Sequence, residues 1–372
     1  MPAGRLAIVC PWAPPERSAV TQYVLQVAAG LARTHEVHVV WSGASAGAVD
    51  VAGTRTWRVD GGVSALLATL GAIGPARAVI QYSPYLWAHS GFDVTGPALV
   101  TGLARAGTPA DVLWHELWVP PIPRPVAALR GLFQRAMAAV IGRTARRSIV
   151  TSAERVGELC SVTGLPASRF ALVPMASLVP VEPTAAAERE VTRTALGLSP
   201  GQLALVLFGF DHDSRPTAGL AAVHRALAAA GVASRLVIVG TARVKLDGAA
   251  RDWPLELGYC APERVSRVFA AADLFLAPFV DGISTRRTST AAAFAHGLPV
   301  VTTVGPHTDK QVFHPGVAAL APIDDPAAFA RAVVEVALAP DRRAELARAG
   351  LTLFADLFAW PRHLAALAEV HA

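Results

Sequence analysis

Short runs of β-branched and leucine residues alternate with longer helical patterns along almost the whole 372-residue chain. This alternation is typical of βα units, because neighbouring strands of a parallel sheet must be joined by long crossovers that are usually helical. In the first half, strands are predicted at residues 6–10, 37–41, 78–82, 112–115, 148–151 and 170–173. Helices are predicted between them at residues 21–32, 96–105 and 153–161. The predicted fold class is therefore α/β, with doubly wound parallel sheets.

The pattern is interrupted once, by a charged segment bounded by prolines. We interpret residues 179–202 as a connector that follows a first domain at residues 1–178 and precedes a second domain that begins at residue 203. In this second series, strands are predicted at residues 203–210, 236–239, 255–257, 274–277, 300–303 and 318–320. Helices are predicted at residues 217–229, 262–271, 287–295, 325–338 and 342–350.

The mean hydropathy of +0.41 makes a membrane span the first alternative to test. The longest stretch without a charged residue, 288–308, holds two glycines and two prolines, so it predicts a helix, a turn and a strand. The apolar run before Pro11 is too short for the hydrophobic region of a signal peptide. The three cysteines are far apart and predict neither disulfides nor a zinc site. These observations predict a cytoplasmic protein.

The net charge of +5 is unevenly distributed, because residues 124–147 contain six arginines and no acidic residue. On a helical wheel, one face carries Arg124, Arg135, Arg143 and Arg146, and the opposite face carries Val126, Phe133, Met137 and Ile141. Two interpretations stay open. The helix either packs its apolar face on the core with solvated arginines outside, or lies on the anionic inner face of a membrane.

In parallel sheets, loops at the carboxyl ends of the strands form the binding sites. A dinucleotide oxidoreductase is not indicated, because the first strand is followed by PWAPPERSAV and not by a GxGxxG fingerprint. Aromatic residues are not interleaved with the basic ones, so a nucleic-acid partner is not expected either.

Several segments together resemble the glycosyl transferases group 1, the family 4-like retaining enzymes with the GT-B fold. They are PWAPPERSAVTQY, QYSPYLWAHSGFD, WHELWVP, the stretch GYCAPERVSRVFAAADLFLAPFVDGISTRRTSTAAAFAHGLPVVTTVGPHTD, and FAWPRHLAAL. The resemblance covers about 350 residues in the family's order. It implies two Rossmann-like domains facing across a cleft, the second at residues 203–352. It also implies that a C-terminal helix within residues 353–372 returns to the first domain.

The resemblance further implies a reaction in which a nucleoside diphosphate leaves the anomeric carbon of a sugar. Negative charge develops on the departing phosphates, and guanidinium groups together with helix N-terminal N–H donors stabilise it. Arg286 and Arg287 directly precede a predicted helix, and Arg215 matches approximately a basic residue of the family. His115, at the end of a predicted strand, matches a histidine that approaches the donor sugar. These four residues are the catalytic candidates.

The remaining candidates follow from the same resemblance. Donor-binding residues are expected at Ser18, Ala19, Gly209, Tyr259, Asp281, Ser284, Thr285, Thr288, Ser289 and Asp309. Acceptor-binding residues are expected at Tyr82, Tyr85, Trp87 and Glu116. For the three aromatic residues, packing inside the domain is the alternative interpretation. For Asp309 the alternative is a helix-start cap.

The sequence departs from the family at its paired glutamates, spaced E-x7-E. Ala292 occupies the second position and Ser284 the first, unless Asp281 replaces it. Which residue then binds the ribose, and so which nucleotide is used, stays open. Asp211 and Asp213 form a DxD triplet, which in the unrelated GT-A fold binds a divalent cation. The GT-B resemblance favours arginines in place of a metal.

We therefore expect a metal-independent, retaining glycosyltransferase without a cofactor, using a nucleotide sugar and a small-molecule, lipid-linked or glycan acceptor. The sugar, the acceptor and the oligomeric state are not predicted by the sequence. The missing glutamate also leaves open a catalytically silent GT-B protein that binds a nucleotide or glycan. A third class is another GT-B enzyme, such as an epimerase or a phosphorylase.

Overall fold

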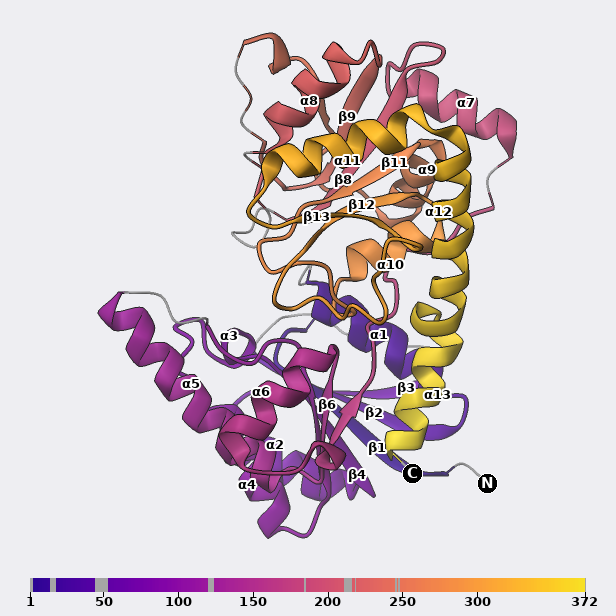
Figure 1. Ribbon diagram of the computed structural model, residues 1–372. Coiled ribbons are helices and arrows are strands. Elements are labelled where there is room, and N and C mark those ends of the chain that lie inside the picture. Colours follow the sequence, from indigo (N-terminus) through magenta and orange to yellow (C-terminus); the bar gives the residue numbers. More distant parts are fainter. Residues whose placement is uncertain are drawn as a thin grey trace. The chain divides into compact units, whose positions relative to one another are not determined.

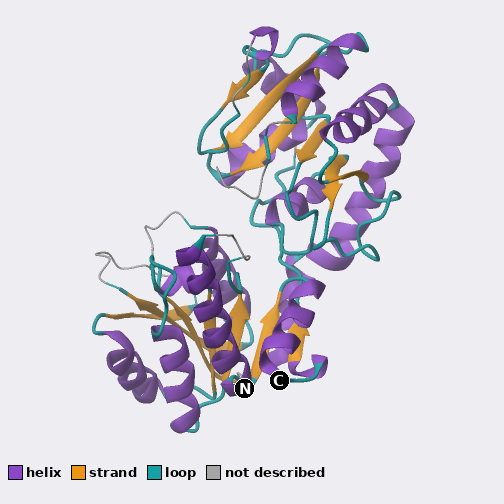
Figure 2. Ribbon diagram, turned by 60° about the vertical axis from the view of Figure 1, so that its left-hand side comes forward, coloured by secondary structure: helices purple, strands orange, loops and turns teal. Residues whose placement is uncertain are grey.

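The computed structural model describes residues 3–13, 18–43, 53–119, 124–183, 185–210, 216–217, 219–244, 246 and 248–371. The chain divides into two compact units, coloured along the sequence in Figure 1. Unit 1 comprises Met1–Pro174 together with His363–Ala372, and unit 2 comprises Met175–Arg362. Each unit contains its own parallel sheet with helices packed against it (Figure 2), so the predicted α/β class with two doubly wound sheets is confirmed.

The sheet of unit 1 has seven strands in the order β3-β2-β1-β4-β5-β6-β7. All neighbouring pairs are parallel. The strands are β1 (Ala3–Cys10), β2 (His35–Ser42), β3 (Thr54–Val59), β4 (Arg77–Tyr82), β5 (Ala110–Trp114), β6 (Arg147–Val150) and β7 (Phe170–Leu172). The central strands are almost fully buried, as expected for a sheet covered by helices on both faces.

Six helices connect these strands, and a seventh comes from the end of the chain. They are α1 (Ala19–Leu31), α2 (Gly62–Ile73), α3 (Pro84–Trp87), α4 (Thr95–Arg105), α5 (Pro125–Thr144), α6 (Ala153–Thr163) and α13 (Trp360–His371). Helix α13 packs on helix α1 of unit 1, where a Cβ atom added at Gly30 would lie 2.5 Å from Cδ1 of Leu364. The predicted return of the C-terminal helix to the first domain is therefore confirmed.

A buried histidine attaches α13 to unit 1. The Nδ1–H of His363 donates to the carbonyl oxygen of Pro174 at 2.8 Å, because a carbonyl can only accept. The Nε2 atom of His363 therefore accepts from the hydroxyl of Tyr23, also at 2.8 Å. Burial lowers the pKa of His363 to about 4, against the opposing effect of the Pro174 hydrogen bond. The ring is thus neutral, with its two nitrogens bonded to helix α1 and to the residue at which the chain leaves unit 1.

Unit 2 contains a six-stranded parallel sheet in the order β10-β9-β8-β11-β12-β13. The strands are β8 (Leu203–Gly209), β9 (Ser234–Gly240), β10 (Pro254–Glu256), β11 (Leu274–Ala277), β12 (Val300–Val304) and β13 (Ala319–Pro322). The helices are α7 (Ala186–Ala195), α8 (Leu220–Ala229), α9 (Pro262–Ala271), α10 (Thr288–Ala295), α11 (Pro326–Leu338) and α12 (Pro340–Leu353).

Several elements of the structure, among them β3, α2 and α7, have no counterpart in the predicted pattern. Strand β3 is an edge strand whose outward residues Arg55 and Trp57 are exposed, so it has no continuous apolar run. At the residues of helix α2 the sequence pattern predicts no element. Helix α7 lies within the predicted connector, where its Arg189 and Arg193 form ion pairs with Asp273 at 2.7 and 3.0 Å. The segment therefore packs on unit 2.

The helix predicted from the arginine-rich segment forms as α5, but its buried face is only partly the predicted one, because Ile141 is buried whereas Phe133 and Met137 are half-buried. Val126 is 64% exposed, whereas Gly131, Gln134, Ala138 and Gly142 are buried together with Ile141. Small residues allow α5 to approach α4 and α6 closely, so packing turns the helix away from the orientation that hydrophobicity alone favours. Among the residues that the structure describes, no helix has the length and apolarity needed to cross a membrane.

The contact between α5 and α6 gives a testable consequence. A Cβ atom added at Gly142 would lie 2.7 Å from Cγ2 of the buried Thr163, whereas one added at Gly157 of α6 would meet nothing within 4 Å. Gly142→Ala should therefore destabilise the protein by about 1–3 kcal/mol through overpacking. The matched Gly157→Ala should stabilise it by up to about 1 kcal/mol through helix propensity. Urea denaturation of both variants checks this, and equal stabilities would contradict the close helix contact.

Candidate functional site

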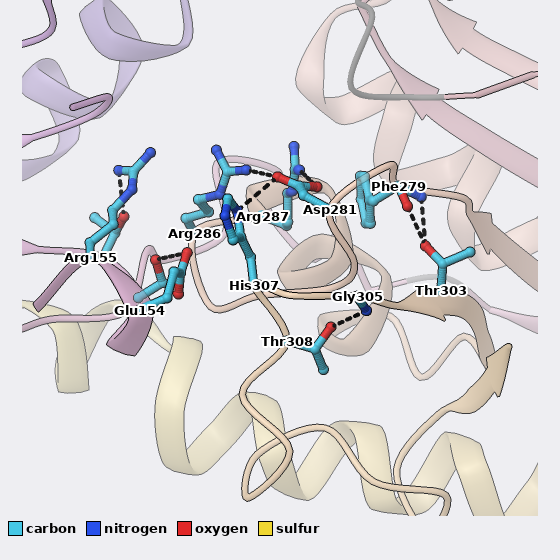
Figure 3. A network of polar contacts seen from close by, with 12 residues as sticks. Glu154, Arg155, Phe279, Asp281, Arg286, Arg287, Thr303, Gly305, His307 and Thr308 are labelled. Carbon is cyan, nitrogen blue, oxygen red and sulfur yellow. Dashed lines mark hydrogen bonds and ion pairs between the residues drawn. The ribbon is translucent and has the colours of Figure 1, made fainter. Parts of the chain in front are cut away.

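The carboxyl ends of the unit 2 strands carry a cluster of charged side chains centred on Asp281. Its carboxylate forms ion pairs with Arg286 and Arg287 through separate oxygens. His307 lies on the third side, with Nδ1 3.3 Å from Oδ2 of Asp281. Figure 3 shows these three side chains converging on the carboxylate from two loops. The structure therefore brings the two predicted arginines together on a residue that the sequence offered as a donor contact.

Two glycines allow these loops to approach each other at backbone distance. Gly282 has φ +87°, and a Cβ atom there would lie 2.4 Å from the backbone nitrogen of Gly305. A Cβ atom on Gly305 would lie 2.7 Å from the carbonyl carbon of Asp281. The N–H of His307 donates to the carbonyl oxygen of Asp281 at 3.0 Å. The sequence DG followed by a second Gly-containing turn thus fixes where the Asp281 side chain points.

The side chains of the cluster stay ionised although they are mostly shielded from water. The side chains of Arg286 and Arg287 are only 20% and 13% exposed. Burial disfavours ionisation of Asp281, but the hydrogen bond from His307 and the two guanidinium charges outweigh it, so the pKa of this carboxyl lies far below its ordinary value. The Arg287 guanidinium also lies over the Phe279 ring at 4.2 Å from its centroid. Two positive charges against one negative leave the cluster cationic.

Helix α10 begins directly after the arginines, with Arg287 at its N-cap and no acidic residue in its first turn. The first N–H groups of a helix and its dipole favour an anion at this position. Arg286, Arg287 and the start of α10, with Thr288 half-buried and Ser289 buried, therefore form a site suited to an anion with several oxygens.

The positions of the family's glutamates are both buried. Ser284 is 1% exposed and Ala292 is fully buried in the core of unit 2. Thr285 is also buried, and its carbonyl oxygen accepts a hydrogen bond from the N–H of Met175 at 3.1 Å. No carboxylate occupies either position, so the acidic group of this region is Asp281.

In unit 1, His115 follows the carboxyl end of β5 and is held from three directions. Its Nε2–H donates to Oε1 of Gln81 at 2.8 Å. Its carbonyl oxygen accepts from the Arg155 guanidinium at 2.7 Å. The Tyr23 ring meets the His115 ring edge to face, with centroids 5.7 Å apart. Because a carboxamide oxygen can only accept, the Nε2 atom bears the proton and Nδ1 is a hydrogen-bond acceptor.

Burial, reinforced by the positive charge of Arg155, lowers the pKa of His115 to about 3. The imidazole is therefore neutral throughout the physiological range. Since the unfolded chain titrates near pH 6.5, the neutral ring stabilises the fold above that pH. This contribution is lost as the pH falls from about 6.5 toward 3. A neutral Nδ1 acceptor suits a hydroxyl donor and not an anion.

The structure places the four acceptor-side candidates in different environments. Tyr82 is 1% exposed and packs edge to face on Trp114, so the packing alternative applies to it. Trp87 is half-buried, and its Nε1–H donates to the carbonyl oxygen of Gln81 at 2.9 Å. Tyr85 is half-buried, and Glu116 is exposed and accepts from the Ser83 hydroxyl at 3.2 Å.

The donor-side candidates also fall into different environments. Ser18 caps helix α1 by accepting from the Thr21 N–H at 3.2 Å, and Ala19 is the first residue of that helix. Gly209 ends β8 with φ +140°, and Tyr259, after β10, is 44% exposed. Asp309 accepts from the Gln311 N–H at 3.0 Å, but a turn and not a helix follows it, so the helix-cap alternative is not met. Arg215 and the DxD triplet lie outside the described residues.

Three residues of these clusters were missed by the sequence reasoning. Gln81 and Arg155 fix His115, and Phe279 supports Arg287. The sequence does contain an indication of Gln81, because it is a polar residue in the otherwise apolar strand segment AVIQY. Within the described part of the chain, no group of three or more His, Cys, Asp or Glu side chains is placed to hold a metal ion.

A comparison with known protein families matches the part of the chain that contains the Asp281 cluster. Residues 215–338 match the family described as Glycosyl transferases group 1. The match therefore assigns this region, and not the whole chain, to the group 1 glycosyl transferases. The matched residues include the Asp281 cluster and helix α10. Comparison of the sequence with curated proteins gives no significant match.

Solved structures resemble the chain over its full length, which extends the GT-B fold beyond the group 1 domain to both units. Sucrose-phosphate synthase from Thermosynechococcus elongatus has a TM-score of 0.77 at 17% identity, over 99% of this chain and 98% of that one. HepE from Anabaena, in complex with UDP and glucose, has a TM-score of 0.74 at 13% identity, over 99% of both chains. WaaG, a glycosyltransferase involved in lipopolysaccharide biosynthesis, has a TM-score of 0.66 at 15% identity, over 98% and 99%.

The hydrogen bond between Gln81 and His115 gives a prediction about pH. Gln81→Glu places a carboxylate against the ring, which should raise the pKa of His115 from about 3 toward its ordinary value of about 6.5. NMR titration of the His115 ring between pH 4 and pH 8 measures this shift. The half-buried Gln26→Glu on helix α1 is the matched control and should leave the His115 titration unchanged. A ring that titrates identically in wild type and Gln81→Glu would contradict the assigned tautomer.

Proposed function

We propose that the protein transfers a sugar from a nucleoside diphosphate sugar to a hydroxyl group of an acceptor, with retention of the anomeric configuration. The observation that carries this proposal is the pair of ordered, shielded guanidinium groups beside the start of α10. A guanidinium has five N–H donors, more than a shared carboxylate can engage. The pair can therefore bind a diphosphate while Asp281 continues to orient it.

The chemistry of this site matches the departure of a diphosphate. Charge grows on the leaving oxygens as the bond to the anomeric carbon breaks, so fixed positive groups lower the barrier. In this proposal Arg286 and Arg287 supply the charge that a divalent cation supplies in other transferases. Arg215 is proposed to assist them, as its match to the family implies.

On unit 1, the neutral His115 is proposed to accept a hydrogen bond from a sugar hydroxyl through Nδ1. The low pKa of His115 supports this role, because the ring does not compete for the phosphates as a cation would. Glu116, exposed beside it, is proposed to contact the acceptor together with Tyr85 and Trp87. The acceptor itself is proposed to be a hydroxyl compound that is small, lipid-linked or a glycan.

A double substitution tests the arginine pair. Arg286→Ala with Arg287→Ala should lower turnover by about 10²- to 10⁴-fold, because donors aimed at developing charge are each worth a large factor in rate. Turnover is measured as sugar release or transfer from a panel of UDP- and GDP-sugars that includes UDP-glucose. Arg264→Ala with Arg267→Ala, two exposed arginines of α9, is the charge-matched control and should remain active. A double variant as active as this control would refute the proposal.

One competing function is a GT-B protein that binds a nucleotide without transferring a sugar. It is favoured by the buried Ala292, because this residue stands where the family has a glutamate. Calorimetry with UDP and GDP separates the two functions. Tight binding that is lost in Arg286→Ala with Arg287→Ala, together with no turnover across the donor panel, would favour the binding protein.

A further inference from the structure

Helix α5 presents an apolar stripe to solvent. Val126, Leu129, Leu132 and Val140 are 64%, 61%, 66% and 40% exposed, and the exposed Ala136 lies between the last two. At 100° per residue these positions occupy one side of the helix, opposite the buried small residues that contact α4 and α6. In Figure 1, α5 lies at the outside of unit 1 beside α6. A contiguous exposed aliphatic stripe on a helix indicates an interaction surface.

Positive charge surrounds this stripe, and negative charge is absent from the helix. Residues 124–147 contain no Asp or Glu. Arg130 and Arg135 lie on opposite flanks of the stripe on the helical wheel, while Arg124 and Arg143 lie at its two ends. Arg146 is already engaged, because it forms an ion pair with Asp111 at 2.9 Å. The stripe is therefore bordered by cationic groups on every side.

Two of the flanking guanidiniums are held by aromatic rings. Arg130 lies 5.7 Å from the centroid of Phe92, and Arg135 lies 5.2 Å from the centroid of Trp118. These contacts restrain both side chains beside the stripe. The guanidinium groups that border the apolar stripe are thus held in place by these rings.

We infer that the outer face of α5 docks on an anionic lipid surface. An amphipathic helix with aliphatic residues between basic flanks buries its apolar side at the boundary of headgroups and acyl chains, while the basic groups contact anionic headgroups. A second copy of the chain fits poorly, because two such helices would place arginines against arginines with no acidic partner in residues 124–147. The stripe also lacks exposed aromatic residues, which usually anchor protein interfaces.

Docking through α5 would bring a particular loop to the lipid. The Oε1 atom of Gln134, on the buried side of α5, accepts from the N–H of Val119 at 2.7 Å. Together with the contact between Arg135 and Trp118, this bond connects α5 to the loop that begins at His115 and Glu116. A helix lying on a membrane therefore holds this loop close to lipid headgroups.

The test is sedimentation of the full chain with vesicles of phosphatidylcholine alone or mixed with phosphatidylglycerol. Wild type should bind the mixed vesicles, and binding should weaken as salt is raised. Leu129→Ser with Leu132→Ser should reduce the bound fraction at least about ten-fold, because two large apolar side chains are lost from the contact. The control is Val191→Ser with Leu338→Ser, two exposed aliphatics of unit 2 that should not alter vesicle binding.

One further double variant and one measurement complete the test. Arg124→Gln with Arg135→Gln should remove the preference for phosphatidylglycerol, and Arg143 is left in place because its Nε–H donates to the carbonyl oxygen of Thr163 at 2.8 Å. Sedimentation velocity without vesicles reports self-association. The inference is overturned if wild type ignores the mixed vesicles, or if the Leu129→Ser, Leu132→Ser variant binds them as wild type does. It is also overturned if wild type is a dimer that this variant dissociates. None of these outcomes depends on a sugar donor, so the proposed transferase activity is tested separately.

Discussion

The ion pairs between Asp281 and its two arginines are the interaction on which the charged cluster of unit 2 depends. Adjacent guanidiniums repel each other, and in a mostly buried position they would turn toward water unless a counter-charge held them. Asp281 supplies that charge, and His307 supports it from the facing loop. The carboxylate keeps both forks in place beside α10. It also leaves an excess of positive charge for an anionic ligand.

The two units offer chemically different groups at the carboxyl ends of their strands. Unit 2 presents a cationic cluster, whereas unit 1 presents a neutral imidazole whose tautomer is fixed by Gln81. This difference corresponds to the two parts of a nucleotide sugar, an anionic diphosphate and a neutral polyol. Burial, reinforced by the charge of Arg155, lowers the pKa of His115 and keeps it from becoming a second cation.

The sequence predicted what depends on local pattern and missed what depends on tertiary context. Buried strands such as β8 and β11 have continuous apolar runs and were predicted. In the edge strand β3, exposed residues alternate with partly buried ones, and this strand was not predicted. The buried face of α5 was only partly predicted because glycines and alanines, which carry little hydrophobic signal, determine its packing. The arginine pair was found through its place before a helix. The role of Gln81 could not be found, because it requires knowing that β4 and β5 are neighbours.

The structure of the protein crystallised with UDP would test the central claim most directly. The account predicts that oxygens of the diphosphate lie about 2.7–3.2 Å from guanidinium nitrogens of Arg286 and Arg287. It also predicts that Asp281 still contacts both side chains. A diphosphate bound elsewhere on unit 2, with the two arginines engaged by Asp281 alone, would contradict it.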